Sequence, residues 1–446
     1  MNLLEKTANV VSFNLIQTFT TKILAAVQFA ILLRLLPTAD IGVYGLVAGY
    51  IGMLGLFAIA PETIFLRDFV KYKDRLAEHV SAFTVFGLVR GFVTLGVGVP
   101  LTLFIATVQP HPHLVPYFLL AILAFSISLL TGPFREAFYG NFRQGRITLV
   151  DLVSSGVSLA GMIFLYYSRD LVSFGLIQVG VAVFGLAWWY WNAKKHLGFS
   201  WKLLPGWWGD SLRALSHFSF WNQLTSVALR VAYQADIIIL GFFAGLSTLG
   251  DYTVALTLAN VFFVIPQLVQ KAGILSFSRV EEKHSLRRGL GTMIRYNTIL
   301  VLGQFLGFVV LGQWLIAFFG PENPDVVWLY SLYLVGGVTL FSLARPWVAI
   351  LIAKVDAKEL FGKLFVWFAV LSAVVYVPVT HVYGVVGLAQ ANVGLYLLLG
   401  LLAAGFATFK LALWPDFSMS DAEKKWLSNV RKGDMGIINL NWGKKV

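Results

Sequence analysis

Two basic residues, Lys22 and Arg230, stand in the middle of long apolar stretches and have the clearest chemical potential in this sequence. Each lies roughly 18 Å from either end of its stretch at a helical rise of about 1.5 Å per residue, too far for the side chain to reach a membrane surface comfortably. A charge at that depth costs about 2.5–3.5 kcal/mol even on lenient insertion scales, so it is expected to face water or an anionic ligand. Because lysine and arginine both bind phosphate oxygens, a phosphate or diphosphate group is the predicted ligand.

Small polar residues accompany both cations at helical spacing. Residues three and four apart share one face of a helix, so each cation is predicted to belong to a polar stripe that lines a shared central cavity. The candidate lining residues are Asn14, Thr18, Asn222, Ser226 and Gln234. Arg90 and Arg345 are candidates to extend the basic lining, or else to neutralise buried carboxylates, and Arg34 is expected at the outer mouth.

Carboxylates inside apolar stretches offer a second chemistry. A transporter driven by protons or sodium needs a carboxylate whose charge changes or is matched by the ion. Asp236 and Glu62 are the candidates for ion coupling, and a satisfied ion pair is the alternative for Asp236. Arg230 is not its partner, because six residues place the two side chains about 240° apart around one helix.

The elements that position these residues are predicted to be membrane helices. The chain is 58% hydrophobic and 13% charged, far from the roughly 45–50% and 25% of soluble domains, and a spanning helix needs about 20 apolar residues. Twelve spans are expected, at roughly 10–36, 41–66, 80–106, 114–134, 147–167, 171–193, 217–244, 249–272, 293–318, 325–350, 360–380 and 384–410.

Basic residues are distributed unevenly between the connections. Alternate connections are rich in lysine and arginine, whereas those near residues 107–116, 244–250, 318–326 and 378–384 have none, and Arg169 stands alone in another outer connection. By the positive-inside rule both termini are predicted to be cytoplasmic. We expect a six-helix lobe at 1–193, an amphipathic cytoplasmic linker at 194–216, a second lobe at 217–410 and a cytoplasmic tail at 411–446.

An internal repeat relates the two halves. Gly42 and Tyr44 recur as Gly250 and Tyr252, an offset of 208 (250 − 42), and the same offset places Lys22 opposite Arg230. A parallel repeat about an axis along the membrane normal leaves such a pattern. Within the first half, Gly45 and Gly49 are spaced for close helix packing.

Several classes of site are not expected. The chain has no cysteine, and its seven histidines show no spacing typical of a metal site, so no metal or cofactor is predicted. The net charge of +12 is attributed to basic cytoplasmic loops rather than to nucleic-acid binding. No nucleotide-binding loop, nucleophile motif or cleavable signal peptide is recognised.

Three segments resemble patterns of the polysaccharide transporter family, which includes the Wzx oligosaccharide flippases. Residues 30–48 (AILLRLLPTADIGVYGLVA) resemble its first repeat, and residues 236–255 (DIIILGFFAGLSTLGDYTVA) its second. Residues 134–146 (FREAFYGNFRQGR) resemble the basic loop after its fourth helix. The family belongs to the same superfamily as MATE multidrug exporters and lipid II flippases.

The resemblance implies two six-helix lobes around a central cavity in a bacterial cytoplasmic membrane. The implied activity is alternating-access flipping of an undecaprenyl-diphosphate-linked oligosaccharide without bond cleavage, with Lys22 and Arg230 at the head group. Implied partners are membrane lipids, a proton or sodium ion, and glycan polymerase or ligase machinery. A cation-coupled MATE-type exporter and a membrane glycosyltransferase or ligase are the alternatives.

Overall fold

The computed structural model describes residues 3–55, 73–141, 143–201, 220–278 and 280–418. Side chains are described from residue 17 onward in the first helix, and for all but residues 73, 222, 226, 229, 230, 232, 233 and 275 farther along. Helices joined by short connections make up this part of the chain, with no strand among them. Helices satisfy their own backbone hydrogen bonds, as a lipid environment requires.

The N-terminal lobe comprises the helices up to residue 197. They are α1 (Leu3–Leu35), α2 (Thr38–Leu54), α4 (Leu76–Val108), α5 (Leu114–Ser128), α6 (Gly132–Gly140), α7 (Gln144–Ser168) and α8 (Leu171–Leu197), with a short 3₁₀ turn, η3 (Lys73–Arg75), before α4.

The C-terminal lobe comprises the later helices. They are α10 (Phe220–Phe243), α11 (Leu246–Phe262), α12 (Val264–Ser278), α13 (Lys283–Phe319), α14 (Pro324–Leu343), α15 (Arg345–Lys354), α16 (Ala357–Leu360), the π-helical turn η5 (Phe361–Phe365) and α17 (Val366–Leu411).

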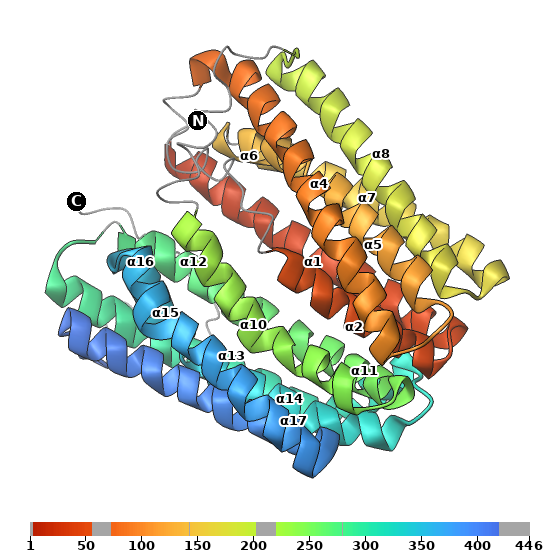
Figure 1. Ribbon diagram of the computed structural model, residues 1–446. Coiled ribbons are helices and arrows are strands. Elements are labelled where there is room, and N and C mark those ends of the chain that lie inside the picture. Colours follow the sequence, from red (N-terminus) through yellow and green to blue (C-terminus); the bar gives the residue numbers. More distant parts are fainter. Residues whose placement is uncertain (1–2, 56–72, 142, 202–219, 279, 419–446) are drawn as a thin grey trace, which may run out of the picture.

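Helix α17 contains a reversal at Gly384, where φ is +64° and ψ is −153°, a conformation open to glycine alone. The end of α17 therefore returns to α16, where Lys410 Nζ lies 2.7 Å from Glu359 Oε1, 51 residues earlier in the chain. Figure 1 shows the chain running out and back on either side of this point.

Nine helical segments in the described residues are long and apolar enough to cross a membrane, and α2 and part of α10 are shorter apolar helices. One of the nine, Ala357–Leu411, contains the Gly384 reversal and so holds two of the expected spans. The chain is therefore a multi-pass α-helical membrane protein, as predicted, although the count of twelve spans stays a prediction.

The two lobes meet along α2, α10 and α11 and diverge toward the ends where α4 begins and α12 ends (Figure 1). The contact is reciprocal. A Cβ atom on Gly42 would lie 2.0 Å from the Leu246 carbonyl oxygen, and a Cβ on Gly250 would lie 2.1 Å from that of Thr38. Thr38 and Leu246 are also 208 residues apart (246 − 38), so the contact follows the sequence repeat.

The predicted close packing of α2 is confirmed. Gly45 lies against Thr253 of α11, Gly49 against Ile237 of α10, and Gly52 against Gln234. Small residues let the two lobes approach to backbone distance here. We call the region where α1, α4, α10 and α13 end and α2, α5, α11 and α14 begin the contact end.

Candidate functional site

Lys22 is exposed in α1, and among the described residues no carboxylate pairs with it. Its direction follows from Phe29, seven residues on and therefore only about 20° away around the helix. The Phe29 ring lies 6.1 Å from that of Phe319, in the other lobe. Lys22 thus lies on the face of α1 that turns toward the C-terminal lobe, about 10 Å nearer the start of the helix than this contact.

The opposite side of α1 packs within its own lobe. Gln17 and Arg135 both bond the Asp151 carboxylate of α7, and Gln28 Nε2 donates to Ser155 O at 3.1 Å. Gln17 is about 140° around the helix from Lys22. Asp151 therefore neutralises Arg135 and leaves Lys22 without a carboxylate in the described part of the chain.

The remaining predicted lining residues divide into three groups. Thr18 is half-buried one turn before Lys22. Gln234 lies in the contact between the lobes, against Gly52. The side chains of Asn14, Asn222, Ser226 and Arg230, and the whole of Glu62, lie outside the described residues.

Arg34 is at the contact end, where its Nη2 donates to Phe318 O at 2.7 Å and so joins α1 to α13 of the other lobe. Its guanidinium also lies 5.9 Å from the centre of the Phe318 ring. In this conformation the residue acts as a tie between the lobes.

Arg90 and Arg345 do not lie exposed as Lys22 does, and their part in a basic lining stays a prediction. Each is buried within its own lobe, 4% and 6% exposed. The Arg345 guanidinium lies 4.5 Å from the Phe341 ring centre, and its Nη1 donates to Gln270 Oε1 at 2.5 Å. Arg90 lies 5.8 Å from the Phe86 ring centre. Aromatic contacts contribute to holding both guanidinium groups.

Asp236 is a fully buried carboxylate held by three hydrogen bonds. Its Oδ2 accepts from Tyr252 Oη at 2.7 Å and from Asn392 Nδ2 at 2.9 Å, and its Oδ1 accepts from the Ile237 amide at 2.8 Å. No salt bridge to Asp236 is found within the described ranges, so the alternative of a satisfied ion pair has no partner there.

Helix α17 carries three buried oxygens without a hydrogen bond among the described residues, two of them on residues that interact with this carboxylate. Tyr376 interacts with it electrostatically, and Thr380 follows one turn later on the same helix face. Tyr376 Oη, Thr380 Oγ1 and Asn392 Oδ1 are buried, and no hydrogen bond to any of them is found in the described part of the chain. A buried carboxylate with three uncommitted oxygens can hold a proton or a small hard cation.

Sequence reasoning found Asp236 and the Tyr44–Tyr252 repeat but missed Asn392, Tyr376 and Thr380. The available signal was Gly384: Tyr376 and Asn392 lie eight residues before and after it, so the reversal brings them to the same depth.

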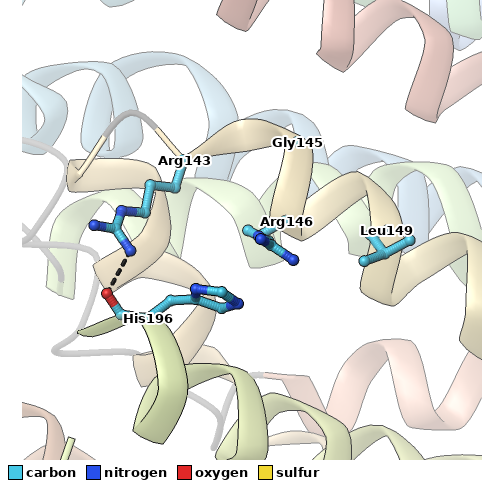
Figure 2. Close-up of a pocket in the computed structure, with 5 residues that line it drawn as sticks. All are labelled: Arg143, Gly145, Arg146, Leu149 and His196. Carbon is cyan, nitrogen blue, oxygen red and sulfur yellow. Dashed lines mark hydrogen bonds between the residues drawn. The ribbon is translucent and has the colours of Figure 1, made fainter. Parts of the chain in front are cut away.

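A separate basic pocket of about 450 Å³ lies where α7 begins and α8 ends. Figure 2 shows its lining residues, Arg143, Gly145, Arg146, Leu149 and His196. Arg143 Nη1 donates to the backbone oxygen of His196, which fixes one guanidinium at the rim. Two arginines above an exposed leucine suit an anionic head group with an acyl chain below it.

Solved structures share this fold at low sequence identity. An inward-facing multidrug resistance MATE family transporter of the MOP superfamily matches with a TM-score of 0.70 and 12% identity, over 88% of this chain and 94% of that one. The lipid II flippase MurJ in an inward closed conformation matches with a TM-score of 0.68 and 13% identity, over 96% and 93%. The chain therefore shares its fold with these two transporters.

A sequence relative is the probable flippase AglR of Haloferax volcanii, 26% identical over 170 residues, which are 36% of this chain. The chain matches about a third (35%) of the length of that curated relative. The family described as polysaccharide biosynthesis protein matches residues 31–323, about two thirds of the sequence. The chain therefore belongs to the polysaccharide biosynthesis protein family.

Proposed function

We propose that this protein is a flippase that moves an undecaprenyl-diphosphate-linked oligosaccharide from the cytoplasmic to the outer leaflet of a bacterial cytoplasmic membrane by alternating access. The observation that carries the proposal is Lys22, an exposed cation at mid-helix on the face of α1 that turns toward the other lobe. Family membership, the flippase named among the relatives and the fold in common with a lipid II flippase support it.

The orientation of the proposal follows the charges. The contact end carries the connections that lack lysine and arginine, so it faces outward, and the diverging ends face the cytoplasm. In this state the lobes are apart on the side where the lipid-linked substrate is made and packed together on the side where it is released.

Lys22 and its repeat partner Arg230 then bind the diphosphate from the two lobes. Both residues make charge-assisted bonds to phosphate oxygens, and two cations on separate lobes draw the lobes together when the anion is bound. Outward opening requires the Gly42–Gly250 contact to separate. No bond of the substrate is broken, and glycan polymerase or ligase machinery would take up the product.

An asymmetry between the lobes provides a path for the prenyl chain. Helix α2 packs along α10 as far as Gln223, whose Nε2 donates to Gly55 O at 3.2 Å. The repeat-related pair, α1 and α11, has no comparable packing among the described residues. We place the prenyl chain on this α1–α11 side, next to Lys22, with its tail remaining in lipid. The basic pocket at Arg143 and Arg146 would hold anionic lipid head groups at the cytoplasmic surface.

Coupling to an ion is assigned to Asp236. Binding of a proton or a sodium ion neutralises the buried carboxylate and changes its bonds to Tyr252 of α11 and Asn392 of α17. Because α11 also forms the contact end, the state of the carboxylate biases the separation of the lobes.

The test is a flipping assay in proteoliposomes with a fluorescent undecaprenyl-diphosphate-linked sugar. Lys22→Gln and Arg230→Gln should each slow flipping by about 10- to 100-fold, the value of a charge-assisted hydrogen bond of about 1.5–3 kcal/mol. Lys22→Arg should retain most activity, and Lys195→Gln, which removes an exposed cation over Trp191, is the matched control.

Wild-type rates in both Lys22→Gln and Arg230→Gln would refute the head-group clamp. The second candidate, a MATE-type exporter of cationic compounds, is favoured by the TM-score of 0.70. It predicts that removing the Lys22 charge leaves efflux of cationic dyes intact or improves it, and that no lipid-linked sugar is flipped.

A further inference from the structure

A cluster of one aspartate and two histidines lies at the contact end, away from the residues assigned to transport. Asp40 is in the first turn of α2, and His111 and His113 are in the connection between α4 and α5. Asp40 Oδ1 lies 2.9 Å from His113 Nδ1 and 3.7 Å from His111 Nε2. One ligand atom from each residue lies within 4.8 Å of the other two.

These distances suit a shared ion. Nitrogen and carboxylate ligands about 2.0–2.2 Å from a zinc ion lie roughly 3–4 Å from one another. The Asp40 side chain is 2% exposed, so its charge requires a partner. The histidines are 19% and 36% exposed, which leaves an entry path for an ion.

The donor set selects the metal. Two imidazoles and one carboxylate suit zinc, nickel or cobalt, whereas calcium and magnesium prefer oxygen ligands. Neutral imidazole is the form that ligates a metal. When neutral His111 binds a metal through Nε2, its proton sits on Nδ1, so Nδ1 no longer accepts the 3.3 Å hydrogen bond from the His113 amide.

A second carboxylate is placed to orient His113. Asp170 Oδ1 lies 3.5 Å from His113 Nε2, on the far side of the ring from Asp40. Asp170 is itself fixed, because it caps α8 by accepting from the amides of Val172 and Ser173. Metal-ligating histidines commonly donate their second ring N–H to such a carboxylate.

We propose that Asp40, His111 and His113 bind one divalent transition-metal ion of the zinc type, which fixes the α4–α5 connection to the start of α2. That connection also carries Gln109, whose Nε2 donates to the carbonyls of Gly241 and Ala244 in the other lobe at 2.5 and 3.1 Å. Asp40 lies between Thr38 and Gly42, which form the lobe contact. The bound ion therefore stabilises the closed contact end, whatever substrate the protein carries.

The test is calorimetric titration of Zn²⁺ into chelator-treated protein in detergent, purified with an affinity tag that lacks histidine. One ion per chain is expected. His111→Ala and His113→Ala should each weaken binding at least tenfold, and Asp170→Asn by about 10- to 100-fold. His79→Ala and His381→Ala are matched controls that should bind as the wild type does. Elution as a single monodisperse species checks that each variant is folded.

Absence of a high-affinity site in the wild type, or unchanged binding in both His111→Ala and His113→Ala, overturns the proposal. The effect on the lobes has its own measurement. The native chain has no cysteine, so Thr107→Cys and Ser247→Cys, both exposed and on different lobes, accept spin labels for pulsed distance measurements. Zinc should raise the short-distance population in the wild-type background and not with His113→Ala; equal distributions overturn the stabilising role.

Discussion

The two lobes carry different chemistry at positions that the internal repeat makes equivalent. In the N-terminal lobe Gln28 donates to a backbone carbonyl of α7, and the Tyr44 ring packs against Phe29. In the C-terminal lobe the equivalent residues are Asp236 and Tyr252, and they bond each other at 2.7 Å. The two lobes thus have equivalent positions on equivalent helices, but only the C-terminal lobe has a buried carboxylate at this position. The comparison supports the proposal that coupling to a proton or sodium ion belongs to the C-terminal lobe.

At the lobe contact, in contrast, the two halves are nearly interchangeable. Gly42 faces the Leu246 carbonyl just as Gly250 faces that of Thr38. Because the contact is symmetric, a change at Asp236 in one lobe can alter the position of both lobes.

The largest expected effect comes from Asp236→Asn. The amide keeps the shape but has no charge to neutralise, so the dependence of flipping on a proton or sodium gradient should fall by about 5- to 150-fold, the range of typical coupling energies. The measurement is flipping in proteoliposomes with imposed pH or sodium gradients.

Gln28→Ala is the matched change in the other lobe. It removes one neutral hydrogen bond to Ser155 O and should leave gradient dependence intact. Equal losses in both variants would contradict the assignment of ion chemistry to one lobe.

The second prediction concerns the symmetric contact. A methyl group on Gly42 or Gly250 would lie about 2 Å from a carbonyl oxygen, and overpacking of this kind costs about 1–3 kcal/mol. Gly42→Ala and Gly250→Ala should therefore destabilise the closed contact end by similar amounts. Pulsed distance measurements between spin labels at Thr107→Cys and Ser247→Cys give the population with the contact end closed.

Gly96→Ala is the control for this pair, because nothing lies within 4 Å of its added Cβ. It should leave the distance distribution unchanged. If the population of the closed contact end differs strongly between Gly42→Ala and Gly250→Ala, the two halves of the reciprocal contact are not equivalent.

The sequence could predict a multi-pass helical fold and the repeat-related contact of Gly42 and Gly250, because hydropathy and the offset of 208 report position along each helix. It could not predict which way each side chain points around the helix axis. Arg90 and Lys22 both stand inside apolar stretches, yet Arg90 is buried beside Phe86 and Lys22 is exposed. Which side chain is buried depends on the helices packed around it, and those helices are distant in the sequence.

Long-range partners explain the other omissions. Asn392 reaches Asp236 across 156 residues, and no local pattern links them. His111 and His113 flank a proline in a short connection, where their spacing differs from helical metal motifs, and Asp40 joins them from 73 residues away.

The smallest expected effect tests an asymmetry within the contact end. The polar bonds that cross it among the described residues are donated by the N-terminal lobe: Gln109 to Gly241 and Ala244, Arg34 to Phe318, and the Thr38 amide to Glu322. Gln109→Ala removes two of these bonds from a partly buried site and should weaken closure by about 1 kcal/mol, roughly fivefold in population.

Thr107→Ala is the control for Gln109→Ala, because its hydroxyl bonds only the Phe104 carbonyl of its own helix. Because Thr107 is itself substituted in this control, the spin labels are placed at Ser247→Cys and Arg169→Cys. Both residues are exposed, and Arg169 follows the end of α7. An unchanged distance distribution in Gln109→Ala would mean that the glycine packing of α2 and α11 closes this end without the polar ties. The hydrogen bonds donated by the N-terminal lobe would then only align the two lobes. The reciprocal glycine contact of Gly42 and Gly250 would govern opening.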